Sequence, residues 1–163
     1  MRSVFVIAGL LVSTACQSGI DDARPSPDLD QAYFRCKVQP VLAKSCGAFA
    51  CHGDGRRFFH LFARNRLRAQ GTEKDRNAAL SADELKANYE AARALVDVAS
   101  PDQSWLLMKP LDVRAGGWFH RGAEIYGQGN VFLAREEADF KTLAAWTTGA
   151  KEEPTCVEPG SDQ

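Results

Sequence analysis

The chain has 163 residues, of which 25% are charged and 45% hydrophobic, and its formal net charge is -1. The composition is typical of a globular protein, and the length suits one domain with a hydrophobic core rather than two. The balanced charge and the lack of any nucleic-acid-binding motif argue against DNA or RNA as a partner.

The first 15 residues have the pattern of an export signal. A positive start is followed by an apolar run from Val4 to Val12, too short to span a bilayer as a helix. Small residues then lead to Cys16, as in a bacterial lipobox, although Ser13 stands where leucine is usual. We expect a lipoprotein signal peptide over residues 1–15, with lipidation of Cys16 anchoring the protein to a bacterial membrane. The alternative is an ordinary secretory signal that is cut nearby.

Residues 16–29 are polar and contain two prolines, a composition that cannot bury much surface. We expect a flexible tether over 16–29, one folded domain over 30–157 and a short tail over 158–163. The domain then faces the periplasm or the exterior, on the oxidising side of the membrane, where disulfides persist.

Apolar residues at helical spacing predict a first helical segment over residues 30–46, either kinked or restarted at Pro40. A second helix is predicted over residues 82–98. Ser81 and Glu84 form a capping-box pattern at its start.

Two further helices are predicted, one over residues 100–108 and one over residues 134–148, which Gly149 ends. Loop-rich stretches over 53–80 and 111–133 separate the helices, and no convincing strand pattern occurs. The sequence therefore predicts a mostly α fold with long connecting loops. Such loops indicate a function or an internal cofactor against which they pack.

Five cysteines are an odd count for an exported protein. Cys16 is assigned to the lipid, and Cys46 and Cys51 belong to one local motif. Cys36 and Cys156 remain, near the two ends of the domain. We expect a disulfide between them; two buried free thiols are the alternative.

The most informative segment is Cys46-Gly47-Ala48-Phe49-Ala50-Cys51-His52. Two cysteines followed directly by histidine are typical of c-type haem attachment, in which both thiols bond to the haem and the imidazole ligates iron. Four residues separate the cysteines here, where two are usual. A local disulfide between Cys46 and Cys51 is one alternative. A zinc site formed by these residues and a fourth ligand is another.

Four separated blocks within residues 33–150 resemble planctomycete-type cytochrome c domains. The blocks are Val38–Cys46 running into Cys51-His52-Gly53, Ser104–Leu111, Gly116–Gly122 and Phe140–Ala150. The resemblance implies a cytochrome c-like arrangement of helices around one covalent haem c. It also implies electron transfer with a redox protein partner that the sequence does not identify. The chain departs from the family in its cysteine spacing and in having a histidine where many members carry methionine.

The resemblance places the second iron ligand at His120, in a glycine-rich loop before the last helix. Met108 is the alternative ligand, since Met/His ligation is common in cytochromes c. His60 is a further histidine, for which packing or hydrogen bonding is the expected role. Two strong axial ligands leave no open iron position, which favours electron transfer over catalysis, and no catalytic constellation is found. The rival functions are a five-coordinate haem protein that binds small ligands and a non-redox lipoprotein with a disulfide or zinc site.

Aromatic residues and a basic run complete the set of candidates. The aromatic residues are expected either to wall the haem or to form plain core: Phe49, Phe59, Trp105, Trp118 and Phe119. The basic run is expected either to be a solvated loop, or to pair haem propionates or steer an acidic redox partner: Arg56, Arg57, Arg64, Arg66, Arg68, Lys74 and Arg76.

Overall fold

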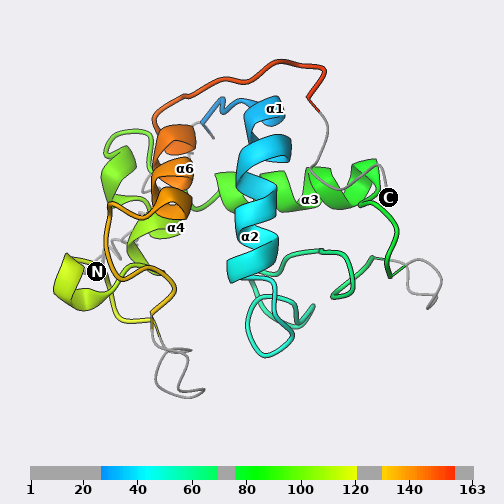
Figure 1. Ribbon diagram of the computed structural model, residues 1–163, viewed down its shortest axis with the longest axis horizontal. Coiled ribbons are helices and arrows are strands. Elements are labelled where there is room, and N and C mark those ends of the chain that lie inside the picture. The colour runs from blue at the N-terminus through cyan, green and yellow to red at the C-terminus, as the bar shows by residue number, and fades with distance from the viewer. Residues whose placement is uncertain (1–26, 70–75, 121–129, 157–163) are drawn as a thin grey trace, which may run out of the picture.

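The computed structural model describes residues 27–69, 76–120 and 130–156, and these form a mostly helical fold (Figure 1). The predicted signal peptide, Cys16, most of the tether and the tail lie outside these ranges. Among the described helices, none combines the length and the apolarity needed to cross a membrane.

The first helical segment is one continuous column of three parts: α1 (Gln31–Tyr33), a π-helix η1 (Phe34–Val38) and α2 (Gln39–Ser45). The Asp30 carboxylate caps its start by accepting a hydrogen bond from the Tyr33 N–H. The wide π turn lies just before Pro40. In a regular α-helix the proline ring would clash with the carbonyl four residues back. The interruption predicted at Pro40 is therefore a widened helical turn, and not the start of a new helix.

Helix α3 (Ala82–Arg93) begins where the sequence predicts. The Ser81 hydroxyl accepts from the Glu84 N–H, and the Glu84 carboxylate accepts from the Ser81 N–H. The prediction that this helix continues to residue 98 was wrong. The Leu95 carbonyl accepts instead from the Leu106 N–H of the next helical segment, so the chain turns away from the helix axis.

The predicted helix over residues 100–108 is two short pieces. They are a 3-10 turn, η3 (Pro101–Gln103), and α4 (Trp105–Met108). Between them Ser104 has extended backbone geometry, and its buried hydroxyl accepts from the Asp97 N–H. A further 3-10 turn, η4 (Val113–Ala115), lies in the predicted second loop.

The last helix, α6 (Ala138–Thr147), starts four residues later than predicted. The Glu137 carboxylate accepts from the N–H groups of Leu133 and Ala134, which holds the preceding residues in a separate turn. The helix ends before Gly149, as predicted. The φ of Gly149 is +92°, in the left-handed region that glycine adopts most readily.

The core lies where α6 and α3 pack against the first column. The ring of Phe34 lies 5.5 Å from that of Tyr89 and 5.2 Å from that of Trp146, between ring centroids. The Trp146 Nε1–H donates to the Asp30 carbonyl, which joins the last helix to the start of the first. In the described residues, the β-structure is limited to one isolated bridge between Leu111 and Phe132.

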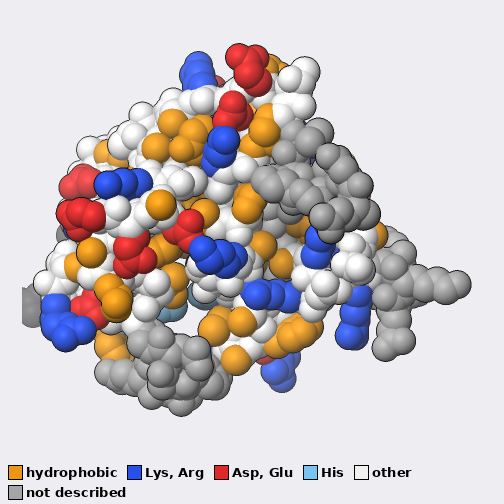
Figure 2. Space-filling model, in the orientation of Figure 1, with side chains coloured by type: hydrophobic (Ala, Val, Ile, Leu, Met, Phe, Trp, Pro, Cys, Tyr) orange, Lys and Arg blue, Asp and Glu red, His pale blue; other side chains and the backbone are white. Residues whose placement is uncertain are grey.

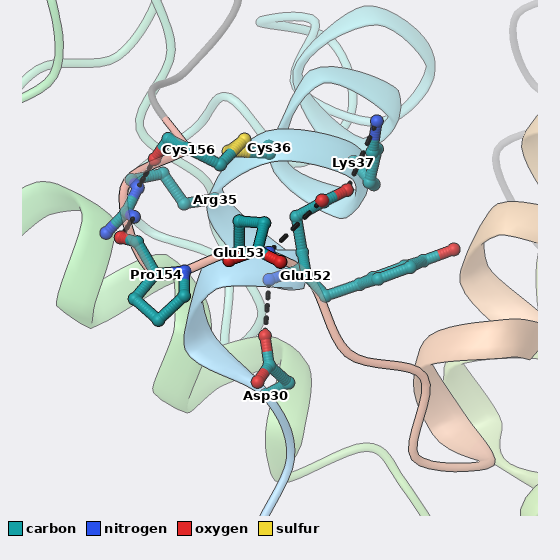
Figure 3. Close-up of a disulfide and its surroundings, with 9 residues drawn as sticks. Asp30, Arg35, Cys36, Lys37, Glu152, Glu153, Pro154 and Cys156 are labelled. Atoms are coloured by element: carbon teal, nitrogen blue, oxygen red, sulfur yellow. Dashed lines mark hydrogen bonds and ion pairs between the residues drawn. A yellow bond between two sulfur atoms is a disulfide. The ribbon is translucent and has the colours of Figure 1, made fainter.

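The chain after α6 crosses over the start of the first column, as Figure 1 shows. There Cys36 and Cys156 form a disulfide, the pairing expected from the cysteine count (Figure 3). Arg35 donates to the carbonyls of Cys156 and Pro154, so a side chain from η1 also holds this segment. The two ends of the domain are therefore joined covalently and by hydrogen bonds.

Candidate functional site

A cavity of about 580 Å³ lies between the end of α2, α4 and the loops that follow each of them. Its volume falls within the range of about 300–1,000 Å³ that is typical of small-molecule and cofactor sites. Most of its lining is apolar. The polar and thiol-bearing residues of the lining are Ser45, Cys46, Cys51, His52, Arg57, Lys109 and His120, and the described lining contains no carboxylate. Figure 2 shows histidine atoms within a hollow bordered by hydrophobic side chains.

The loop that follows α2 is closed by its own backbone. The Cys46 N–H donates to the Leu42 carbonyl at the helix end, and the Cys46 carbonyl accepts from the His52 N–H at 3.0 Å. Gly53 packs so closely on this loop that a Cβ at its position would lie 2.3 Å from the Gly47 carbonyl oxygen. The six-residue step from Cys46 to His52 therefore forms a compact ring, which brings both cysteines and the histidine to one cavity.

The ring of His52 is oriented by a backbone carbonyl. Its Nδ1 lies 2.8 Å from the carbonyl oxygen of Phe59. A carbonyl only accepts, so Nδ1 carries the proton and Nε2 carries the lone pair that a metal ligand needs. Burial lowers the pKa of His52, the bond to Phe59 raises it, and the nearby Arg57 lowers it, with a net shift downward. The imidazole is thus kept neutral near pH 7.

His120 reaches the cavity on a loop tied to α4. The Trp118 N–H donates to the Met108 carbonyl at 2.7 Å, and Lys109 Nζ donates to the Phe119 carbonyl at 3.1 Å. Gly117 lies where a Cβ would be 2.0 Å from the Leu111 carbonyl oxygen. Burial lowers the pKa of His120, and the neighbouring His52, Lys109 and Arg57 lower it further. This imidazole is also neutral near pH 7.

The two imidazole rings lie near one another and are almost parallel. The ring centroids of His52 and His120 are 6.0 Å apart and the ring planes differ by 15°. A metal–imidazole bond is about 2.0–2.1 Å long, so two imidazoles on opposite sides of one metal have centroids roughly 6 Å apart. The observed separation of the centroids is close to this value.

Cys46 and Cys51 are both free thiols, so the local disulfide considered as an alternative is not present in the structure. Cys46 is buried, and burial raises its pKa to about 12, with the neighbouring Cys51 adding to the rise and Arg66 opposing it. Within the described ranges, no three or more His, Cys, Asp or Glu side chains are placed to hold one metal ion. The zinc alternative therefore has no geometric support.

Met108 and His60, the other ligand candidates, do not line the cavity. Met108 is buried, and its sulfur lies 3.5 Å from a guanidinium nitrogen of Arg135. The His60 ring is bonded at 3.0 Å to the Arg57 carbonyl and packs edge-on against Phe62. Both residues are thus held away from His52, whereas His120 is brought to it.

Three of the five predicted aromatic residues, Phe59, Trp105 and Phe119, line the cavity. Phe49 does not, and Trp118 packs edge-on against Trp105 beside it. Two of the lining aromatics are more than half exposed, Trp105 at 58% and Phe119 at 53%. Large apolar side chains that are this exposed around a cavity are typical of a site where a bound apolar group covers them.

The residues of the predicted basic run differ in their surroundings. Arg57 lines the cavity, whereas Arg56 pairs with Asp54 and Arg68 with Glu84. Lys74 lies outside the described residues. Lys109 is the other cation of the described cavity lining, and the sequence analysis missed it.

Sequence analysis also missed Phe58, which is 98% exposed at the cavity, although it lies two residues from Arg56 in the basic run. The remaining walls come from distant parts of the chain, among them Leu95, Val131 and Leu143. The helical periodicity of the sequence predicted Leu143 only as a core residue. No local pattern in the sequence pointed to Leu95 or Val131.

Comparison of this chain with protein-family models, with curated proteins and with solved structures finds no match. The resemblance to planctomycete-type cytochrome c domains therefore depends on the sequence blocks that carry it. The functional conclusion has to come from the site.

Proposed function

We propose that this chain is a monohaem c-type cytochrome that transfers electrons outside the cytoplasm from a lipid-anchored position. The observation that carries the proposal is the pair of neutral, nearly parallel imidazoles of His52 and His120, 6.0 Å apart at a cavity that two free thiols also line. When bound, haem supplies an iron atom that changes between the ferric and ferrous states.

Each residue of the site has a distinct part in holding the group. Cys46 and Cys51 would supply the thiols that attach the haem, and His52, which directly follows the second thiol, would supply one iron ligand. His120 would supply a second iron ligand from the opposite loop. Two imidazole ligands would favour electron transfer over the five-coordinate alternative.

The rest of the cavity suits a large planar group with an apolar body and acidic edges. Its walls are aliphatic and aromatic, and burial among them controls the reduction potential. Arg57 and Lys109 are the two lysine or arginine residues of the described lining. Both donate to backbone carbonyls rather than to carboxylates, so their charge is available to haem propionates.

The lipidated Cys16 and the tether over residues 16–29 are part of the proposal, since they would hold the domain near a membrane on its outer side. A redox protein is the expected partner.

The test is a pyridine haemochrome spectrum of the denatured protein, after export from a host that matures c-type cytochromes. We expect a c-type band that survives acid-acetone extraction, and its loss in the double variant Cys46→Ala/Cys51→Ala. A colourless wild-type protein, from a host that matures a control cytochrome, would overturn the proposal. A disulfide or zinc site at Cys46, Cys51 and His52 would then be reconsidered.

A further inference from the structure

We infer that two buried amide side chains, Gln39 and Asn88, position the haem ligand His52 by fixing the backbone segment whose carbonyl orients its ring. This inference rests on the proposed function, since it assigns these amides a role in setting the properties of the iron. Neither residue lines the cavity, so any effect on His52 has to pass through that segment.

Gln39 and Asn88 are both 0% exposed, and together they hold one residue, Phe62. Asn88 Oδ1 accepts from the Phe62 N–H at 2.9 Å, and Asn88 Nδ2 donates to the Phe62 carbonyl at 2.8 Å. Gln39 Oε1 accepts the other Nδ2 proton of Asn88 at 2.9 Å, and Gln39 Nε2 lies 3.3 Å from the Phe62 carbonyl. Both backbone polar groups of Phe62 are thus bound by side chains.

The segment just before Phe62 is bound to His52 at two points. The Phe59 carbonyl accepts from His52 Nδ1, and the Leu61 N–H donates to the His52 carbonyl at 2.7 Å. Leu61 itself is fully buried. The short stretch from Phe59 to Phe62 therefore connects the amide pair to both the ring and the backbone of His52.

The amide pair belongs to two helices of the core. Gln39 is the first residue of α2 and Asn88 lies in the middle of α3, and these two helices pack against each other. Burying an amide is costly unless its hydrogen bonds are made, and here the two amides bind both each other and the backbone of Phe62. What the amides add is a fixed position for a loop that has no secondary structure of its own.

The consequence for the iron follows from the Nδ1 hydrogen bond. A firm bond from Nδ1–H to a carbonyl fixes the tautomer and makes the imidazole a stronger donor through Nε2. A stronger donor stabilises ferric over ferrous iron. Loosening the segment should weaken this bond and shift the reduction potential upward.

The experiment compares Asn88→Ala with Tyr89→Phe in the haem-loaded protein. Tyr89→Phe is the matched control, because it removes one buried hydrogen bond, to the Leu29 carbonyl, from the neighbouring position of α3. The readouts are the reduction potential and the solvent-exchange rate of the His52 Nδ1–H in the ferrous protein. Haem-free chain gives a third readout, the exchange rate of the Leu61 amide.

We expect Asn88→Ala to raise the potential and to speed both exchange rates by roughly tenfold or more, while Tyr89→Phe loses stability and leaves all three unchanged. If Asn88→Ala does not fold, Gln39→Met, which leaves the two bonds between Asn88 and Phe62 in place, should change the readouts in the same direction by less. The inference is wrong if a folded Asn88→Ala or Gln39→Met variant gives the same three readouts as Tyr89→Phe. It is also wrong if the His52 Nδ1–H of the wild type exchanges rapidly with solvent.

Failure of the proposed function looks different. In that case the wild-type chain takes up no haem, and the Leu61 amide of the haem-free chain still decides whether Asn88 governs the segment. If that amide exchanges equally fast in Asn88→Ala and in Tyr89→Phe, the inference is wrong whatever the cofactor.

Discussion

The imidazole rings of His52 and His120 lie 6.0 Å apart between centroids, with 15° between their planes, although the residues are far apart in the sequence. Neither ring reaches this position by itself. His52 is set by the closed loop after α2 and by the Phe59 carbonyl, and His120 is set by the backbone bond from Trp118 to Met108 of α4. The candidate ligand pair is thus a product of two loops, each tied to a different helix.

Gly53 should tolerate no side chain. In Gly53→Ala the new Cβ would lie 2.3 Å from the Gly47 carbonyl oxygen, and because that oxygen belongs to the backbone, the loop has to shift. We expect a loss of about 1–3 kcal/mol in the free energy of unfolding, measured by urea denaturation. Gly55→Ala is the control, because its Cβ would meet only the Leu67 side chain, with Cδ1 at 3.6 Å and Cδ2 at 3.7 Å. Equal stability of the two variants would contradict the packing described here.

The Cys36–Cys156 disulfide should contribute strongly to stability. It joins residues 120 apart in the sequence, and for loops of this length the loop-closure model gives about 4–5 kcal/mol. The double variant Cys36→Ala/Cys156→Ala should therefore unfold at much lower denaturant concentration than the wild type. Reductant should bring the wild type to the same midpoint. A wild-type midpoint that reductant leaves unchanged would count against the disulfide.

Helix ends that depend on interactions between neighbouring residues could be predicted from the sequence. Ser81 and Glu84 satisfy one another's backbone groups, and Gly149 ends the last helix through its own φ. The missed ends have distant causes: the Leu95 carbonyl bonds to Leu106, and Asp97 bonds to the Ser104 hydroxyl. A sequence window cannot show a partner that only the folded chain brings near.

The same distinction holds for the candidate site. Cys46, Cys51 and His52 are adjacent enough to form a local motif, and the structure places all three at one cavity. The buried amides Gln39 and Asn88 carry no such signal, because a polar residue in an amphipathic helix is normally expected on its solvent face. Their burial depends on the Phe62 backbone, which reaches them only through tertiary packing.

Acid should weaken the fold through Glu84. Burial alone would raise its pKa, but hydrogen bonds from Arg68 and from the N–H groups of Ser81 and Ala69 bring the pKa down to about 2, from 4.5. The stabilisation is complete above pH 4.5 and is lost as the pH falls toward 2, because protonation removes the charge that Arg68 and the two N–H groups bind.

Glu84→Gln tests this directly. It should cost about 3 kcal/mol at pH 7, and the difference from wild type should shrink as the pH falls toward 2. Denaturant unfolding at several pH values measures both quantities. Asp83→Asn, at an exposed position of the same helix turn, is the control. A stability difference between Glu84→Gln and wild type that does not change with pH would contradict the assignment.

The two thiols of the motif should differ in reactivity when no haem is attached. Cys46 is buried with a pKa of about 12, whereas Cys51 is partly exposed. Alkylation requires a thiolate that the reagent can reach, so iodoacetamide should label Cys51 well before Cys46. Mass spectrometry of haem-free native protein measures the order. Resistance of both thiols, relieved by reductant, would instead indicate the local disulfide.

The most direct test of the central claim is electron paramagnetic resonance of the ferric, haem-loaded protein, comparing wild type with His120→Ala and Met108→Leu. Two imidazole ligands predict a low-spin signal in the wild type, its replacement by a high-spin signal in His120→Ala, and no change in Met108→Leu. A spectrum that His120→Ala leaves unchanged, or that Met108→Leu converts to high spin, would contradict the account.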